Sequence, residues 1–225
     1  EAELLDTSSD PAHGGRHPAG RAVDAGRGRD DRTGNDAPVI DLNGAAAGAD
    51  VTYTWTEPSN AAHVALPFVA GTLVTDADNT NLVGLSLVVS GVVDGASERI
   101  VLGGRSFALN ADQTVTDTGG AYTITYVAAT GTFTVAPVTG VATTAAVQTL
   151  VRGLAYVNDS DNPTAGNRTV TVQVTDAGFE DTAASTGKLV GNVATATIVG
   201  VPSDDQPVVS GLDPVTFFEN TINQA

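Results

Sequence analysis

Apolar and polar side chains alternate repeatedly along the chain from residue 51 onward. In AYTITYV (121–127), two tyrosines and an isoleucine alternate with threonines, and in RTVTVQVTD (168–176) three valines alternate with threonine and glutamine. A period of two places one set of side chains on a buried face and the other set in water. The pattern therefore predicts antiparallel strands with one wet face, packed as a sandwich.

Further segments are rich in valine, threonine, isoleucine and aromatic residues, the composition of strands. Ala129-Thr130-Gly131 supplies the turn of a hairpin between the segments 121–127 and 131–137. Residues 145–157 have helical periodicity; Gly153 ends a short helix there, and a strand follows through Tyr156. The sequence predicts an all-β fold, an antiparallel Greek-key β-sandwich with one short helix. Its predicted strands are 51–57, 65–69, 82–91, 98–104, 121–127, 131–137, 168–176 and 193–201.

Acidic residues dominate the charge, with 26 aspartates and glutamates against 10 lysines and arginines and a formal net charge of −16. This charge argues against a nucleic-acid partner, because phosphate binding needs a basic surface, and it suits a cation-binding extracellular surface. The chain has no cysteine, which excludes disulfides, zinc–thiolate sites and a cysteine nucleophile. No apolar run approaches the roughly 18 residues that cross a bilayer, so we expect no membrane insertion.

Composition and an internal repeat divide the chain into three parts. Residues 1–34 are rich in glycine, arginine, alanine and aspartate without periodicity, and we expect a disordered or spurious leader there. NDAPVIDLNG (35–44) is similar to DDQPVVSGLD (204–213), and TYTWTEPSN (52–60) is similar to VTFFENTIN (215–223). Residues 35–203 are therefore expected to form one full repeat of a tandem array, and 204–225 the linker and truncated start of the next.

Side chains that carry oxygen atoms gather where the predicted strands end. TDAD (75–78) follows an apolar run, SDNP (160–163) precedes the strand 168–176, and VTDAG (174–178) ends it. At about 3.3 Å per residue, this strand would carry Asp161 and Asp176 to opposite ends of the sandwich. Calcium takes about six to eight oxygen ligands in flexible geometry. Asp and Asn are also common turn residues that accept backbone hydrogen bonds, and this alternative stays open.

The Asn/Asp-x-Pro linker, a glutamate within a strand, TDAD, SDNP and VTDAG together resemble the cadherin-like repeats of large bacterial surface adhesins. The resemblance covers about residues 35–220. It implies a cadherin- or immunoglobulin-like sandwich with Ca²⁺ between successive domains. By motif, one end would use Asn35, Asp36, Asp76, Asp78 and Asp176 as metal ligands, and the opposite end Glu57, Asp161, Asp204 and Asp205.

The resemblance further implies a non-catalytic module, a calcium-rigidified spacer or adhesion domain at the bacterial cell surface or outside the cell. Its implied partners are neighbouring repeats of the same chain and a cell-surface or glycan ligand, with roles in cell adhesion or biofilm. The alternatives are a glycan-binding β-sandwich module, which would expose aromatic side chains on one sheet, and an accessory domain of a polysaccharide-degrading enzyme. Tyr53 and Trp55 share one face of their strand, where a core position is favoured over a sugar-stacking platform. Glu57 in the same strand can also simply face water.

Overall fold

The computed structural model describes residues 34–59, 61–205 and 207, so the expected leader, apart from residue 34, and nearly all of the expected start of a second repeat lie outside the described residues. The described part is built mainly of strands and contains one α-helix, which confirms the predicted all-β sandwich with one short helix. The helix, α1 (Thr144–Arg152), begins where the Thr143 side chain accepts a hydrogen bond from the N–H of Ala146. It ends at Gly153, as predicted.

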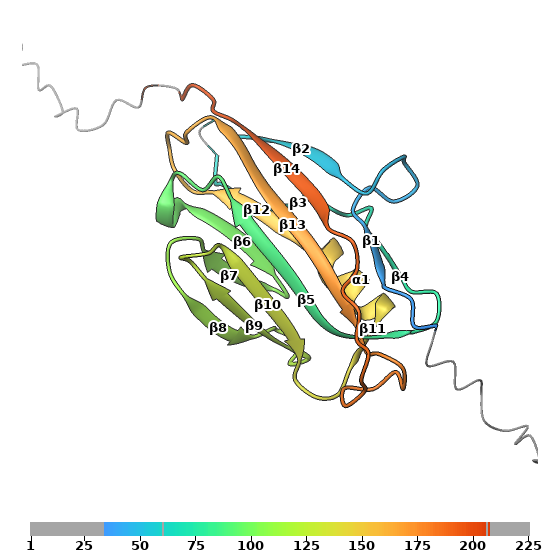
Figure 1. Cartoon of the computed structure of the whole chain (residues 1–225). Coiled ribbons are helices and arrows are strands. Elements are labelled where there is room, and N and C mark those ends of the chain that lie inside the picture. Colours follow the sequence, from blue (N-terminus) through green and yellow to red (C-terminus); the bar gives the residue numbers. More distant parts are fainter. Residues whose placement is uncertain (1–33, 60, 206, 208–225) are drawn as a thin grey trace, which may run out of the picture. The chain divides into compact units, whose positions relative to one another are not determined.

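The larger layer is an 8-stranded sheet with the order β2-β14-β13-β5-β10-β9-β8, in which β11 also pairs with β5 (Figure 1). Neighbouring strands are antiparallel except β2 and β14, which run parallel. The hairpin turn at Ala129-Thr130-Gly131 joins β9 to β10, as predicted. The strands are β2 (Val51–Thr56), β5 (Asn81–Ser90), β8 (Gln113–Thr116), β9 (Tyr122–Val127), β10 (Thr132–Pro137), β11 (Ala142–Thr143), β13 (Gly166–Asp176) and β14 (Ala194–Val201).

A 4-stranded sheet with the order β3-β12-β6-β7 supplies the second layer, and β1 and β4 pair separately. These strands are β1 (Val39–Asp41), β3 (Leu66–Pro67), β4 (Leu73–Thr75), β6 (Glu98–Leu102), β7 (Arg105–Ala108) and β12 (Ala155–Asn158), and a 3₁₀ turn, η2 (Gly95–Ser97), precedes β6. Both layers send apolar side chains into one core. Trp55 is buried there with its ring edge-on to Tyr156, 5.8 Å between ring centroids, so the core position predicted for it is correct.

The opposite face of the large sheet, which we call the outer face, is covered by small uncharged side chains. Cross-strand pairs such as Thr52 with Thr197 and Thr134 with Thr125 place threonines next to one another. Within the described strands, none of the outward positions holds an aromatic or charged residue. They are Thr52, Thr54, Thr56, Thr195, Thr197, Val199, Val201, Asn167, Thr169, Thr171, Gln173, Thr175, Gly84, Ser86, Val88, Ser90, Thr132, Thr134, Ala136, Thr123, Thr125, Val127, Thr114 and Thr116.

The described chain enters and leaves at opposite ends of the sandwich (Figure 1). Asn35 contacts Asp176, the last residue of β13, and we call this the incoming end. From there β5 and β14 run to the other end, where Val201 leads into the linker 202–205; we call this the outgoing end. The two linkers are therefore separated by the length of the central strands.

Candidate cation sites at the two ends of the sandwich

At the incoming end, the linker is held to the sandwich by polar contacts. Asn35 donates a hydrogen bond from Nδ2 to the carboxylate of Asp176 at 2.7 Å. The side-chain amides of Asn35 and Asn79 are also within hydrogen-bond distance, 2.6 Å apart. The N–H of Asp36 donates to Oδ1 of Asp78 at 3.1 Å. The structure thus brings the linker together with TDAD and VTDAG, three segments that are far apart in the sequence.

Asp176 is fully buried at the end of β13. Its Oδ1 accepts hydrogen bonds from the N–H groups of Gly178 and Leu189, both at 2.9 Å, while Oδ2 accepts from Asn35. These donors are neutral amides, which stabilise a carboxylate but leave its negative charge in place. Asp176 therefore presents a buried carboxyl group to the incoming linker.

Asp76 and Asp78 are two like-charged side chains in the turn between β4 and β5. Oδ1 of Asp76 accepts from the N–H groups of Asp78 and Asn79 at 3.4 and 3.3 Å, whereas its Oδ2 is buried without a hydrogen-bond partner. Burial raises the pKa of Asp76 to about 6, and the neighbouring carboxylate of Asp78 adds to this rise. Two charged carboxylates this close repel each other, and a bound cation would relieve the repulsion.

Asp181, which none of the sequence motifs includes, connects the loop after β13 to the start of β5. Its carboxylate accepts hydrogen bonds from the N–H of Asn81 at 3.1 Å and from Nδ2 of Asn81 at 3.0 Å. Its backbone has φ of 53°, a left-handed conformation that aspartate tolerates better than most residues. Asp181 therefore positions the loop beside the TDAD turn.

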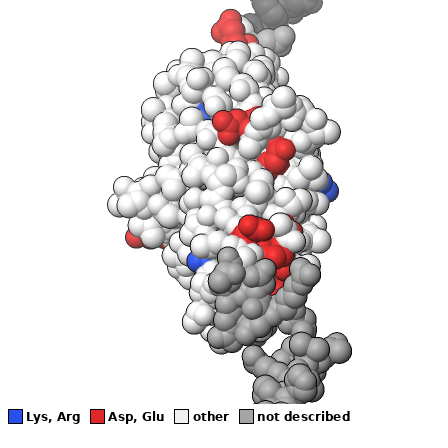
Figure 2. All heavy atoms as spheres, turned by 45° about the vertical axis from the view of Figure 1, so that its right-hand side comes forward, with Lys and Arg blue, Asp and Glu red and all other residues white. Residues whose placement is uncertain are grey.

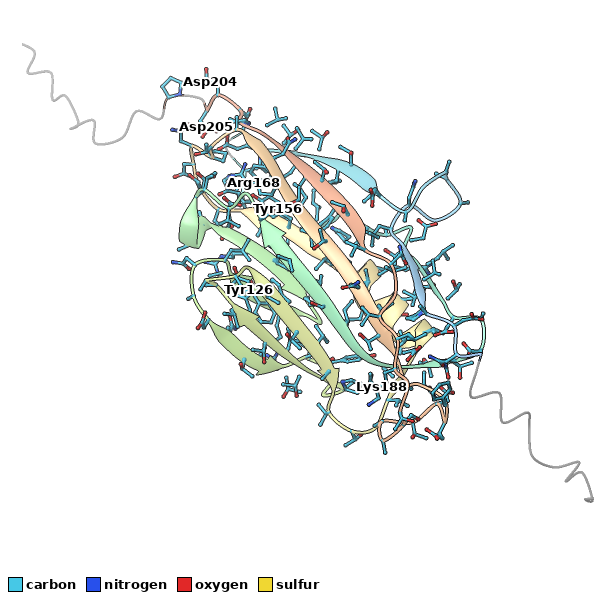
Figure 3. The ribbon with its side chains drawn as sticks, viewed as in Figure 1. Tyr126, Tyr156, Arg168, Lys188, Asp204 and Asp205 are labelled. Carbon is cyan, nitrogen blue, oxygen red and sulfur yellow. The ribbon has the colours of Figure 1, made fainter. Side chains whose placement is uncertain are left out.

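At the outgoing end, Glu57 holds the other linker. Its N–H donates to the carbonyl of Val201 at 3.0 Å, and the N–H of Ser203 donates to its Oε2 at 2.8 Å. Glu57 is only 3% exposed, and its Oε1 has no hydrogen-bond partner. The alternative that Glu57 simply faces water is therefore wrong. Asp204 and Asp205 follow in the exposed linker (Figure 3).

Asp161 lies in the loop between β12 and β13, at the end of β13 opposite to Asp176, as expected from the length of that strand. Its side chain is exposed. The buried acidic residues near this loop are instead Asp94, which is largely buried and accepts hydrogen bonds from Thr164, and Glu98. The structure therefore places Asp161 at the predicted end but not in the buried polar network.

That network is centred on Arg168, which was not among the predicted site residues (Figure 3). Its guanidinium donates from Nε and Nη2 to the two oxygens of Glu98, each at 3.0 Å, and from Nη2 to Asp94 at 3.0 Å. The hydroxyl of Tyr156 also donates to Glu98, at 3.0 Å. Burial alone would raise the pKa of Glu98, but the hydrogen bonds from Arg168 and from the backbone lower it below its ordinary value. Arg168 thus supplies the cation that these two carboxylates need.

The incoming end offers a mixed set of oxygen atoms. Figure 2 shows acidic side chains at several separate places on the visible face, with a group of them in its lower part, while most of that face carries no charge. Within the described part of the chain, no three carboxylate or imidazole side chains stand close enough to hold one metal ion by themselves. A cation there would need amide or carbonyl oxygens as well, which calcium accepts and zinc, with its preference for nitrogen and sulfur, does not.

Comparison with known proteins gives no family assignment: no protein-family model matches the chain, and no curated protein matches it. The resemblance to cadherin-like repeats stays a prediction from the motifs. In the described residues, no helix has the length and apolar character needed to span a membrane.

Proposed function

We propose that the chain is a non-catalytic extracellular repeat module of a large bacterial adhesin, acting as a spacer or adhesion domain that calcium rigidifies at its ends. One observation carries the proposal. Among the described residues, the buried side-chain oxygens without a hydrogen-bond partner belong to Asp76 and Glu57. One lies at the incoming end and the other at the outgoing end, and both residues are ligands predicted from the sequence motifs.

A buried carboxylate oxygen without a partner costs free energy, because it has lost water and gained nothing in return. A divalent cation would reverse that cost by supplying an opposite charge. Both carboxylates are connected to a linker: Asp76 lies beside Asp78, which accepts a hydrogen bond from the N–H of Asp36, and Glu57 itself accepts one from the N–H of Ser203. Cation binding at these places would order the linker and so stiffen the connection between repeats.

The alternative functions find less support in the geometry. The outer face has no aromatic side chain in its described strands on which a sugar ring could stack. The orphaned carboxylates of Asp76 and Glu57 lie at opposite ends of the sandwich, so they do not form a pair across a cleft. Asp94 and Glu98 do form a pair, but Arg168 compensates their charge.

Thermal unfolding of the full chain in millimolar calcium, in magnesium and in chelator tests the proposal. We expect calcium to raise the melting temperature more than magnesium does, and the double variant Asp76→Asn/Asp78→Asn to lose this response. A ligand at about 100 times its Kd adds about 2.7 kcal/mol to the free energy of unfolding. A shift of several degrees is therefore within reach.

The matched control is Asp50→Asn/Asp112→Asn, which removes the same charge elsewhere. Both residues are exposed, and each accepts one backbone hydrogen bond that asparagine can still accept. The experiment is repeated on a tandem protein, residues 1–205 followed by residues 37–225, in which Asp204 and Asp205 replace Asn35 and Asp36 of the second copy. No calcium response in either protein, or an equal loss in the control, would refute calcium binding.

A further inference from the structure

An open hollow lined by both apolar and polar atoms, with the apolar ones in a slight majority, lies between α1 and the turns that flank β9 and β10. Its volume is about 420 Å³. The turn before β9 lines one side and the segment between β10 and β11 the other, with the first turn of α1 completing the wall. Val138 and Ala146 are exposed members of this lining, and Val138 has 49% of its surface in contact with solvent.

The hollow belongs to the incoming end. Thr143, in its wall, pairs with Asn81 at the start of β5, and Asn81 is bonded to Asp181. Two residues earlier, Asn79 contacts Asn35 of the incoming linker. The hollow and the point where the described chain enters the sandwich therefore lie at the same end.

The outgoing end exposes apolar side chains of its own. Val93, in the turn after β5, is 59% exposed, and Val201, the last residue of β14, is 39% exposed. Val93 is held in place, since its N–H donates to the buried Glu98 at 2.8 Å. The next repeat begins directly after Val201, because Asp204 and Asp205 correspond to Asn35 and Asp36 in the sequence repeat. The outgoing end of one repeat and the incoming end of the next are thus neighbours.

We infer that the hollow receives the outgoing end of a neighbouring copy of this module, with Val93 and Val201 among the apolar side chains that the contact covers. This inference rests on the tandem array of the proposed function but not on its cation. Burial of apolar surface contributes at any ionic composition, whereas the carboxylates at the same end repel unless a cation is present. The inference therefore adds a direct contact between repeats to their connection through the linker.

The test compares two neighbouring alanines of α1. Ala146 lines the hollow, whereas Ala145, also exposed, does not. Glutamate at either place suits the first turn of a helix. In the tandem protein defined above, Ala146→Glu in the second copy puts a long, charged side chain into the hollow, and Ala145→Glu does not.

We expect the tandem protein to melt at least about 2–4 °C above the full chain. With Ala146→Glu in both proteins, the tandem protein should melt at the same temperature as the single chain. With Ala145→Glu in both, the difference in melting temperature should remain. Equal melting of tandem protein and single chain, or a difference that survives Ala146→Glu, would overturn the inference. The two proteins are compared both in calcium and in chelator. The proposed function is tested separately, by the rise in melting temperature that calcium causes and by its loss in the variant Asp76→Asn/Asp78→Asn.

Discussion

Replacing Asp76 by asparagine should stabilise the protein when no cation is present. The change removes the charge of a carboxylate whose Oδ2 is buried without a partner, next to Asp78. Asparagine has nearly the same shape, and its Oδ1 can still accept from the N–H groups that Asp76 binds. The variant therefore isolates the electrostatic cost of holding a charge at this position.

The pKa sets the magnitude of this effect. The pKa of Asp76 is raised from 3.8 to about 6, first by burial and then by the neighbouring carboxylate of Asp78. At about 1.4 kcal/mol per pKa unit, the full shift corresponds to about 3 kcal/mol. Because Asp76 is partly exposed, we discount this figure and expect about 1–2 kcal/mol at pH 7. For a module of this size, that is roughly 2–8 °C in melting temperature.

The sign of the pH dependence follows from the direction of the shift. The folded protein holds the proton of Asp76 up to about pH 6, whereas the unfolded chain releases it near pH 3.8. Wild-type stability should therefore fall as the pH rises from about 4 to 6, and the Asp76→Asn variant should lack this fall.

Urea unfolding in chelator between pH 4.5 and 8 measures both effects, with Asp112→Asn as the control for a lost surface charge. Asp112 is exposed and accepts one backbone hydrogen bond. Destabilisation by Asp76→Asn at pH 7, or a pH dependence equal to that of the wild type, would show that Asp76 is not a strained carboxylate.

Three further predictions concern the outgoing end. Arg168→Met should lower the free energy of unfolding, measured in a denaturant titration, by about 3–5 kcal/mol, because Glu98 would stay buried without its cation. Adding Glu98→Gln to this variant should restore part of the lost stability. The pKa values of Asp94 and Glu98 are lowered, so the stability that these carboxylates contribute should be lost as the pH falls below about 4. Acid unfolding is measured on the Asp76→Asn variant, because the titration of Asp76 has the opposite effect on stability. A free energy of unfolding that does not change with pH below about 4 would contradict the prediction. Glu57→Gln should reduce the calcium response of the tandem protein while costing little stability in chelator. Unfolding is followed by the fluorescence of Trp55, the single tryptophan of each copy, and an unchanged calcium response would exclude Glu57 as a ligand.

Long alternating segments predicted the centre of the fold well. β5, β9, β10, β13 and β14 were all expected, because a period of two over six or more residues is typical of a half-buried strand and of little else. The short strands β1, β4, β7, β8 and β11 were missed, since a few residues carry too little periodicity. Gly103 and Gly104, both with positive φ, could have indicated the hairpin between β6 and β7, because glycine pairs favour such tight turns.

The candidate site was predicted where short motifs and strand geometry sufficed. Asp176 had to end a strand, and Asp161 had to lie at its other end. The network of Arg168 with Glu98 could not be predicted, because the partners are 70 residues apart and nothing local in either segment indicates burial. The surroundings of Glu57 likewise come from a distant segment, because its N–H binds the carbonyl of Val201 and its side chain binds the N–H of Ser203.

Calorimetric titration of the tandem protein with calcium tests the central claim most directly, because its junction contains both linker ends from one sequence. We predict saturable binding of calcium that magnesium does not reproduce, and its loss when Asp76→Asn/Asp78→Asn is placed in the second copy. Absence of binding, or binding that persists in this variant, would contradict a cation site at the incoming end and leave a spacer that is held by direct contact alone.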